Sequence, residues 1–329
     1  MIQDLPAEVR PPTLRTFPLR RLTGRDLRPL LDEEAAYWAA ELLWDFGEVA
    51  AAVAAGVDRG TLAGRYVNDA GGPAAYCYYV RESGRTVVGS AFAMGGARRR
   101  GYEARLVEDV LVEATAAGGD GRVECQTLFC SDAQVDSSFA AAGFVGRARH
   151  YMVRDLHDPL PEGGAAGVRL RPLRREDLSL AARIIYRSHQ ATLDAALNLT
   201  YATETHCRAF VETLVMRAGC GTFDTEASFV AETGGRPAGV LLASGLSTSA
   251  GHVCQVSVDP DCQRRGVGES LMLEALRAFR RGGRSHASLS VTVDNRGAYR
   301  LYERLAFRVR RPFAAFAWVR PPARIAVPS

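Results

Sequence analysis

The chain has no lysine, so all 41 of its Lys and Arg residues are arginine. Against 37 acidic residues this leaves a formal net charge of +4, a surplus too small to indicate a nucleic-acid-binding protein. No stretch approaches the roughly 18 uncharged apolar residues that a transmembrane helix needs. We therefore expect neither nucleic acid nor membrane as a partner, although arginines can still bind phosphates through their forked donors.

The sequence also lacks paired cysteines. Its seven cysteines are an odd number and none lies in a Cys-x-x-Cys pair, so we expect no disulfide framework and a reducing compartment. His206 and Cys207 are neighbours, but two adjacent residues do not make a metal site, and no metal is expected. Residues 1–12 contain no apolar run behind a basic start, which predicts a cytoplasmic protein without a signal peptide.

A segment rich in glycine and proline divides the chain near its midpoint. Residues 157–167, "HDPLPEGGAAG", contain two prolines and three glycines without a periodic pattern, which is typical of a linker. The sequences on its two sides repeat in the same order: residues 19–27 match 170–178, residues 98–119 match 263–283, and residues 138–153 match 301–319. Such a duplication predicts two tandem domains of one fold, at residues 1–156 and 168–329.

The second half alternates between strand and helix patterns. Strands are expected at 168–173, 228–233, 237–245, 251–258, 286–293 and 313–319, and helices at 176–189, from the Arg-Gly turn to about 281, and at 296–307. Gly234 and Gly235 predict a hairpin, and a β-α-β crossover follows it. The order predicts an α/β (α+β) domain with a mixed, mostly antiparallel sheet flanked by helices.

The segment "QRRGVGES" (263–270) lies between a predicted strand and a predicted helix. The start of a helix has unpaired N–H groups and a partial positive charge, and glycines let a diphosphate approach the backbone closely. A P-loop would require Gly-x4-Gly-Lys-Ser/Thr, which is absent. A dinucleotide fingerprint would require a third glycine where this chain has Leu271.

The turn resembles the acyl-CoA signature of the GNAT (GCN5-related) N-acetyltransferase superfamily. It carries Gln-x-x-Gly-x-Gly after a strand that ends in Val-x-Val-Asp-Pro (256–260). Residues 291–307, "VTVDNRGAYRLYERLAF", are similar to a second segment of that family, and only Ala306 departs from the usual glycine. The resemblance implies two tandem GNAT-like domains, acetyl-CoA as co-substrate and a primary amine as acceptor.

The resemblance also implies roles for individual residues. The backbone of Val256–Val258 would bind the pantetheine arm, the backbone of Arg264–Glu269 would hold the pyrophosphate, and Asn295 would bond the amide region of the cofactor. Tyr302 would act as general acid, since a phenol can donate a proton to a departing thiolate. Alternatively Tyr302 is a packed helix residue and Asn295 a turn residue. The cofactor-binding residues expected on this basis are Val256, Ser257, Val258, Gln263, Arg264, Arg265, Gly266, Val267, Gly268, Glu269, Ser270 (through its hydroxyl) and Asn295.

No strong base precedes the motif. Many members of the family have a glutamate there, whereas this chain has Cys254 and Gln255. His252 is the nearby group that titrates in the right range, and water alone is the other option. Deprotonation at pH 7 costs about 4.6 kcal/mol for a lysine-type amine but only about 1.4 kcal/mol for an α-amine, which favours an acceptor of low pKa. Cys254 is expected to be inert packing.

The first half departs further from the motif. Gly101-Tyr102-Glu103 stands where the second half has Gly266-Val267-Gly268, and Phe139 matches Tyr302. We predict that this half kept the fold, lost the cofactor site and walls the acceptor cleft. Its aromatic residues Trp38, Trp44 and Phe46 are expected either in the core or in that wall.

Several functional alternatives remain open at the level of sequence. The tandem layout is shared with mycothiol synthases, but no residue set singles that activity out. The acceptor could be a small molecule or a protein N-terminus, and the protein a monomer or a homodimer. A non-catalytic acyl-CoA-binding sensor is the main alternative to an enzyme, and a nucleotide-binding regulator is a third possibility.

Overall fold

The computed structural model describes residues 14–82, 84–95, 101–116, 121–190, 192–216 and 220–320. The N-terminal residues 1–12, for which no signal peptide is expected, lie outside this range, as do the arginines Arg98–Arg100 of the first repeat. Within the described residues, no helix is both long enough and apolar enough to cross a membrane.

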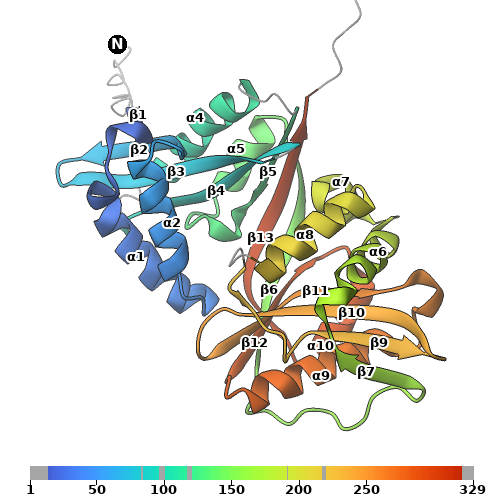
Figure 1. The fold of residues 1–329 in the computed structure, drawn as a ribbon. Coiled ribbons are helices and arrows are strands. Elements are labelled where there is room, and N and C mark those ends of the chain that lie inside the picture. Colours follow the sequence, from blue (N-terminus) through green and yellow to red (C-terminus); the bar gives the residue numbers. More distant parts are fainter. Residues whose placement is uncertain are drawn as a thin grey trace, which may run out of the picture.

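A single twisted sheet of 13 strands runs through both halves of the described chain (Figure 1). The strands of the first half are β1 (Thr16–Pro18), β2 (Ala63–Asp69), β3 (Gly72–Glu82), β4 (Arg85–Ala93), β5 (Arg122–Gln126) and β6 (Val145–Asp155). Those of the second half are β7 (Val168–Pro172), β8 (Thr222–Phe223), β9 (Phe229–Thr233), β10 (Arg236–Gly245), β11 (Ala250–Val258), β12 (His286–Thr292) and β13 (Arg308–Val319). Their order is β1-β2-β3-β4-β5-β13-β6-β12-β11-β10-β9-β7, with β8 paired to β10.

Helices cover both faces of the sheet in each half. In the first half, α1 (Gly24–Leu42) and α2 (Gly47–Asp58) bury one apolar cluster, and α4 (Tyr102–Ala116) and α5 (Val135–Ala141) bury another. In the second half, α6 (Leu178–His189) and α8 (Glu204–Met216) pack on one face, and α9 (Val267–Arg281) and α10 (Arg296–Arg304) on the other. The mixed α/β fold and the predicted order of elements are confirmed, but the sequence did not indicate α7 (Leu193–Leu197), α8 or β8.

The acidic residues that precede the first helix of each half have matching local roles. Thr23 and Asp26 form a capping box in which each side chain accepts a bond from the other's backbone N–H, which satisfies two of the open donors at the start of α1. Asp177, just before α6, accepts from the backbone of Arg174 and pairs with Arg171 at 2.7 Å. The repeat seen in the sequence therefore extends to how each first helix begins.

The central strands repeat at the level of register. The parallel pair β4–β5 ends at Val88, and the parallel pair β11–β12 ends at Val253. Just beyond each of these points β4 and β11 carry a β-bulge against their antiparallel neighbours β3 and β10, because β4 and β11 each have one extra residue there. In both halves the parallel pairing of the two central strands thus ends at the same place, and in the first half an isolated bridge between Ala91 and Cys130 joins the two segments again.

The last strands of the two halves are exchanged. β13 pairs with β5 of the first half, whereas β6 pairs with β12 of the second half, and the two exchanged strands pair with each other. Figure 1 shows β13 running from the second half into the sheet of the first. The halves thus share one continuous sheet, and a cut in the linker would remove a central strand from each.

Candidate active site

The wedge between β11 and β12 exposes one edge of β11. Residues 250–253 pair with 286–289 of β12, and beyond Val253 the described register of β11 continues only with β10. The predicted pantetheine-binding residues Val256–Val258 lie on this stretch. Backbone N–H and C=O groups along such an edge can pair with an extended, amide-containing ligand as a further strand would. One carbonyl, that of Val258, already accepts a 3.3 Å bond from Gln263.

The predicted phosphate turn lies at the mouth of the wedge. A short 3₁₀ turn (Pro260–Cys262) leads into Arg264 and Gly266, which both have left-handed backbone conformations with φ of 59° and 75°. α9 then begins at Val267, so the open N–H groups of its first turn face outward. Arg264 and Arg265 are exposed beside them. The arrangement has the charge and donors that an anion needs.

The space around Gly268 is consistent with a ligand approaching the helix start. A Cβ added at Gly268 would meet Val258 Cγ2 at 3.5 Å and Leu301 Cδ2 at 3.8 Å, which are ordinary contacts. Packing within the chain therefore does not require glycine here. At Gly266 a Cβ would lie 2.5 Å from the Ala165 Cβ, and its positive φ also favours glycine.

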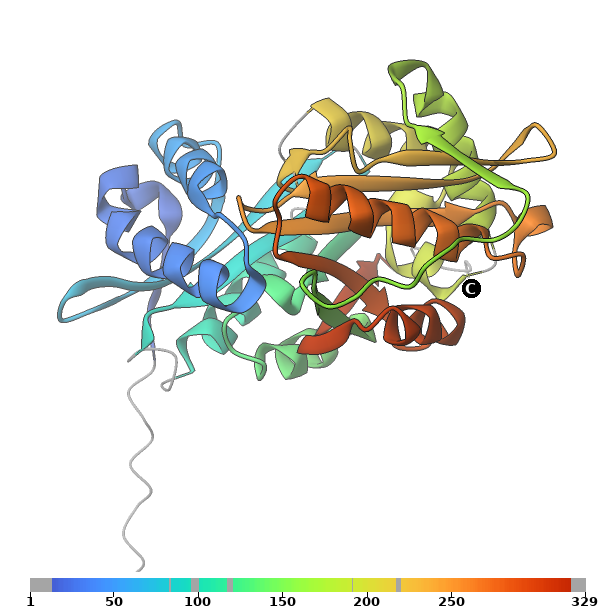
Figure 2. The ribbon, with the colours of Figure 1, turned by 90° about the horizontal axis from the view of Figure 1, so that it is seen from below.

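The linker lies against α9 rather than away from the protein (Figure 2). Arg277 donates to the carbonyls of Pro161 and Gly163, and the backbone N–H of Ala165 donates to the Ser270 hydroxyl at 2.9 Å. The buried Ser270 side chain thus holds the linker beside the phosphate turn.

Asn295 caps the start of α10, and Tyr302 lies within this helix. Asn295 is exposed and caps the helix, since its side-chain oxygen accepts a 3.3 Å bond from Ala298 N–H. Tyr302 is only 6% exposed and packs edge-to-face against Phe307. Burial raises the pKa of Tyr302 above its usual value, the nearby Tyr201 adds to this, and the positive charge of Arg149 opposes it. Tyr302 is therefore a neutral phenol that can donate a proton.

A cavity of about 500 Å³ lies between the two halves. The first half contributes Trp38, Trp44 and Phe129 to its wall, and the second half contributes Tyr201, His252 and Cys254. Trp38 and Trp44 thus serve as core and wall at once, whereas Phe46 is fully buried behind them. Charged side chains also reach this cavity: Glu82, Arg85, Glu124, Arg149 and Asp194.

His252 does not have the properties expected from the sequence. It is buried, and burial, with a smaller contribution from Arg149, lowers its pKa to about 4. The prediction that it titrates near neutrality is therefore wrong, because desolvation disfavours the charged imidazolium. At neutral pH the ring is unprotonated but only weakly basic. Cys254, expected to be inert packing, is half-buried in the cavity wall.

Comparison with known proteins shows the family to which this chain belongs. The sequence model of the Acetyltransferase (GNAT) family matches residues 195–307. A mycothiol acetyltransferase of Thermobispora bispora is 32% identical over 227 residues, which cover 64% of this chain and 69% of that protein. The chain belongs to the GNAT acetyltransferase family. It is an N-acetyltransferase of the tandem type, and its family implies acetyl-CoA as the acetyl donor.

Other relatives of this GNAT acetyltransferase match over different lengths. A mycothiol acetyltransferase of Gordonia bronchialis is 37% identical over 99 residues, which span only 32% of its length. An uncharacterized N-acetyltransferase of Methanocaldococcus jannaschii is 30% identical and is matched over 47% of its length. The solved structure of a GCN5-related N-acetyltransferase from Sphaerobacter thermophilus has a TM-score of 0.62 at 19% identity, and the alignment covers 94% of this chain and 98% of that one. This likeness shows the shared fold.

In the first half of this GNAT acetyltransferase, Glu103 bridges the wedge that is open in the second half. Its buried carboxylate accepts from the backbone N–H of Ala93 at 2.8 Å and of Asp132 at 2.6 Å, and also from the Ser131 hydroxyl. Ala93 and Asp132 are the counterparts of Val258 and Asn295. An acidic side chain of the protein thus occupies the position that corresponds to Gly268.

The cavity of the enzyme contains residues that the sequence did not point to. Tyr201 donates a 3.0 Å hydrogen bond to Gln255, which stands where many GNAT enzymes have a glutamate. The ring of Tyr201 also stacks on that of His189, with 3.9 Å between the ring centroids. Burial raises the pKa of Tyr201 to about 12. The buried Nε of Arg149 has no hydrogen-bond partner among the described residues. No sequence motif marks Tyr201 or Arg149, because they reach the cavity from segments far along the chain from the turn at 263–270.

Proposed function

We propose that this GNAT acetyltransferase uses its second half to transfer an acetyl group from acetyl-CoA to a primary amine by direct attack. The observation that carries the proposal is the wedge between β11 and β12, which opens onto a left-handed turn at the start of α9. Acetyl-CoA supplies an activated thioester carbonyl when it binds. All further steps depend on how residues of this chain hold and protonate the reactants.

The cofactor would lie along the wedge. The unpaired edge at Val256, Ser257 and Val258 suits the amide-rich pantetheine arm. The N–H groups of Gly266–Glu269, together with Arg264 and Arg265, suit the pyrophosphate. Asn295 keeps its amide nitrogen outside the capping bond and could donate to the amide region of the cofactor. Gln263 and Ser270 would act indirectly, since their side chains hold Val258 and the linker.

Tyr302 is proposed as the general acid that protonates the departing thiolate. Its phenol is buried, neutral and close to Tyr201 and Arg149. A raised pKa makes the phenol a weak acid, but it can still donate a hydrogen bond to a thiolate and stabilise its charge.

The acceptor would enter through the cavity between the halves. With His252 held at a pKa of about 4, no strong base lies on β11, so the amine must lose its proton to water or arrive unprotonated. An α-amine of low pKa meets this requirement better than a lysine side chain. Because several relatives are mycothiol acetyltransferases, we propose the amine precursor of mycothiol as the first acceptor to test.

The two halves would have different roles. In this proposal residues 168–329 form the catalytic domain, residues 157–167 the linker, and residues 1–156 a GNAT-like domain without a cofactor site. The bridging carboxylate of Glu103 supports that division, because CoA could enter the first wedge only by displacing it.

Release of free thiol from acetyl-CoA, measured across a panel of amines, tests the proposal. The panel would contain the mycothiol precursor, α-amines, lysine-type amines and peptide N-termini. We expect turnover with an α-amine at neutral pH. Binding of acetyl-CoA without turnover on any amine would favour the sensor instead, and calorimetric binding of ATP or NAD in place of CoA would favour a nucleotide-binding regulator.

A further inference from the structure

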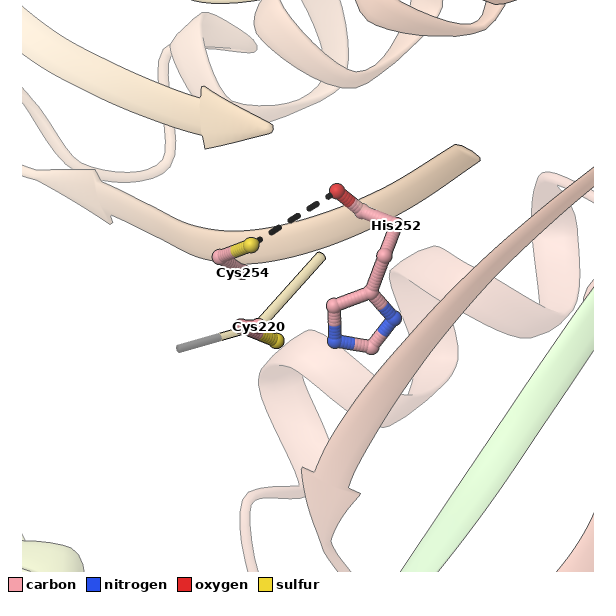
Figure 3. A group of neighbouring side chains, drawn as sticks. All are labelled: Cys220, His252 and Cys254. Atoms are coloured by element: carbon pink, nitrogen blue, oxygen red, sulfur yellow. Dashed lines mark hydrogen bonds between the residues drawn. The ribbon is translucent and has the colours of Figure 1, made fainter. Parts of the chain in front are cut away.

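Three soft-metal ligands meet in the wall of the cavity between the halves (Figure 3). Cys220 comes from the segment between α8 and β8, and His252 and Cys254 come from β11. The sulfur atoms and a ring nitrogen all lie within 4.8 Å of one another. The expectation that the chain has no metal rested on His206 and Cys207, which are not part of this cluster.

The hydrogen bonds of His252 leave its Nε2 lone pair available to bind a metal. The Ser288 hydroxyl donates to the carbonyl of Gly251 at 3.1 Å, so it accepts from Nδ1–H of His252 at 2.9 Å. Nε2 then carries the lone pair. Figure 3 shows the ring with one nitrogen toward β12 and the other on the side of Cys220. A metal-binding histidine is commonly fixed in this way through its second nitrogen.

The two cysteines are held by the backbone around them. Cys254 is the extra residue of the β11 bulge, and its thiol lies 3.2 Å from the hydroxyl of buried Ser244. Cys220 precedes Gly221, where a Cβ would come within 2.3 Å of the Gly245 carbonyl oxygen. Only glycine permits this approach, which keeps Cys220 against the end of β10. The cluster is therefore built into the fold and does not depend on a chance meeting of surface side chains.

We propose that Cys220, His252 and Cys254 bind a thiophilic divalent ion such as Zn²⁺, with the fourth position open to the cavity. Two thiolates and one imidazole with an open fourth position are an established zinc set, with metal–ligand distances of about 2.3 Å to sulfur and about 2.0 Å to nitrogen. Ligand atoms in such a tetrahedron lie roughly 3.5 Å apart, so side-chain movements of about 1 Å would close the site. The two thiols lose their protons on binding.

The proposal concerns metal binding and does not depend on acetyl transfer. The open position would take water, or a thiol or amine that enters the cavity. The metal would thus lie next to the space proposed for the acceptor. There it could either bind the acceptor or keep the acceptor out of the cavity.

Titration with Co²⁺ as a spectroscopic probe tests the proposal. The full chain would first be treated with a chelator and kept under a phosphine reductant without oxygen. We expect one Co²⁺ per chain, with thiolate-to-cobalt charge-transfer bands and the intense visible bands of a tetrahedral site, both bleached by Zn²⁺. The substitutions Cys220→Ser and Cys254→Ser should each abolish these bands. Cys262→Ser, which removes a half-buried thiol outside the cluster, should leave them unchanged.

Circular dichroism on each variant would show that it is folded, so that loss of the bands reports the ligands. Failure of the folded wild type to bind Co²⁺ would overturn the proposal. So would bands that survive both Cys220→Ser and Cys254→Ser, or a disulfide between these two cysteines that persists in the reductant.

Discussion

The carboxyl group of Glu34 makes the stability of this enzyme depend on pH near neutrality. Glu34 is fully buried in α1 and accepts bonds from Tyr76 at 2.5 Å, from the Trp38 indole at 3.1 Å and from the Ser90 hydroxyl. Burial raises its pKa from 4.5 to about 7, although these three donors oppose the shift. The folded protein therefore retains a proton on Glu34 that the unfolded chain has lost.

The sign and size of the effect follow from this difference. Because the folded pKa is raised, the stabilisation from the bound proton is complete below about pH 4.5 and is lost as the pH rises through 7. Each pKa unit corresponds to about 1.4 kcal/mol, so the full loss is about 3 kcal/mol, of which about 2.5 kcal/mol falls between about pH 5 and pH 8.

The substitution Glu34→Gln isolates this contribution. Glutamine keeps the shape and an acceptor oxygen for Trp38 and Ser90 but cannot ionise. Urea denaturation of both proteins at about pH 5 and pH 8 should show the variant gaining about 2.5 kcal/mol relative to wild type at the higher pH. Glu108→Gln, which removes an exposed carboxylate from α4, controls for the change in net charge. An equal free-energy difference between Glu34→Gln and wild type at both pH values would refute the reasoning.

Two further predictions concern catalysis and assembly. Tyr302→Phe should lower kcat about a hundredfold with little change in the KM for acetyl-CoA, because only the proton donor is lost. Tyr299→Phe, on the same helix but bonded to His150, should keep kcat, and wild-type activity in Tyr302→Phe would rule out the general-acid role. The fragment 1–156 lacks β13, which pairs with its β5, and the fragment 157–329 lacks β6, which pairs with its β12. Each fragment produced alone should therefore aggregate on size-exclusion chromatography, because a strand edge is left unpaired. The two fragments produced together should form a stable complex. A monomeric, folded 157–329 fragment that binds acetyl-CoA would contradict this dependence.

The local elements could be predicted from the sequence because their signals are local. Helical spacing in 176–189, the hairpin at Gly234-Gly235 and the stop at Asp259-Pro260 each lie within a few residues of the feature they predict. α8 was not predicted, because residues 204–216 lie outside the segments whose sequences match between the halves, although α2 holds the corresponding place in the first half.

The pairing of β6 with β12 and of β13 with β5 could not be predicted. Each strand ends its own repeat and has a suitable pattern for either sheet, so its partner depends on contacts far along the chain. The same limit applies to His252. The sequence suggests a histidine that titrates in the neutral range, whereas its pKa is lowered by burial, where Trp44 of the first half packs beside it, and by Arg149.

The candidate site depends both on local sequence signals and on contacts between residues that are far apart in the chain. The turn at 263–270 is contiguous, so its glycines and arginines could be identified as a phosphate-binding candidate. The contrast between Gly268 and Glu103 was visible once the repeats were aligned. Two other features could be seen only in the structure. The carboxylate of Glu103 accepts bonds from the backbone of Ala93 and Asp132, and Cys220 lies close to His252.

The stoichiometry and location of acetyl-CoA binding test the central claim most directly. Isothermal titration calorimetry would compare wild type with Gly268→Ala, which fits the available space, and with Gly268→Glu, which copies the carboxylate of Glu103. We predict one acetyl-CoA per chain in wild type, similar binding in Gly268→Ala, and binding at least about tenfold weaker in Gly268→Glu because its charge opposes the phosphates. Two acetyl-CoA molecules per chain, or unchanged binding in Gly268→Glu, would contradict a single cofactor site in the second half.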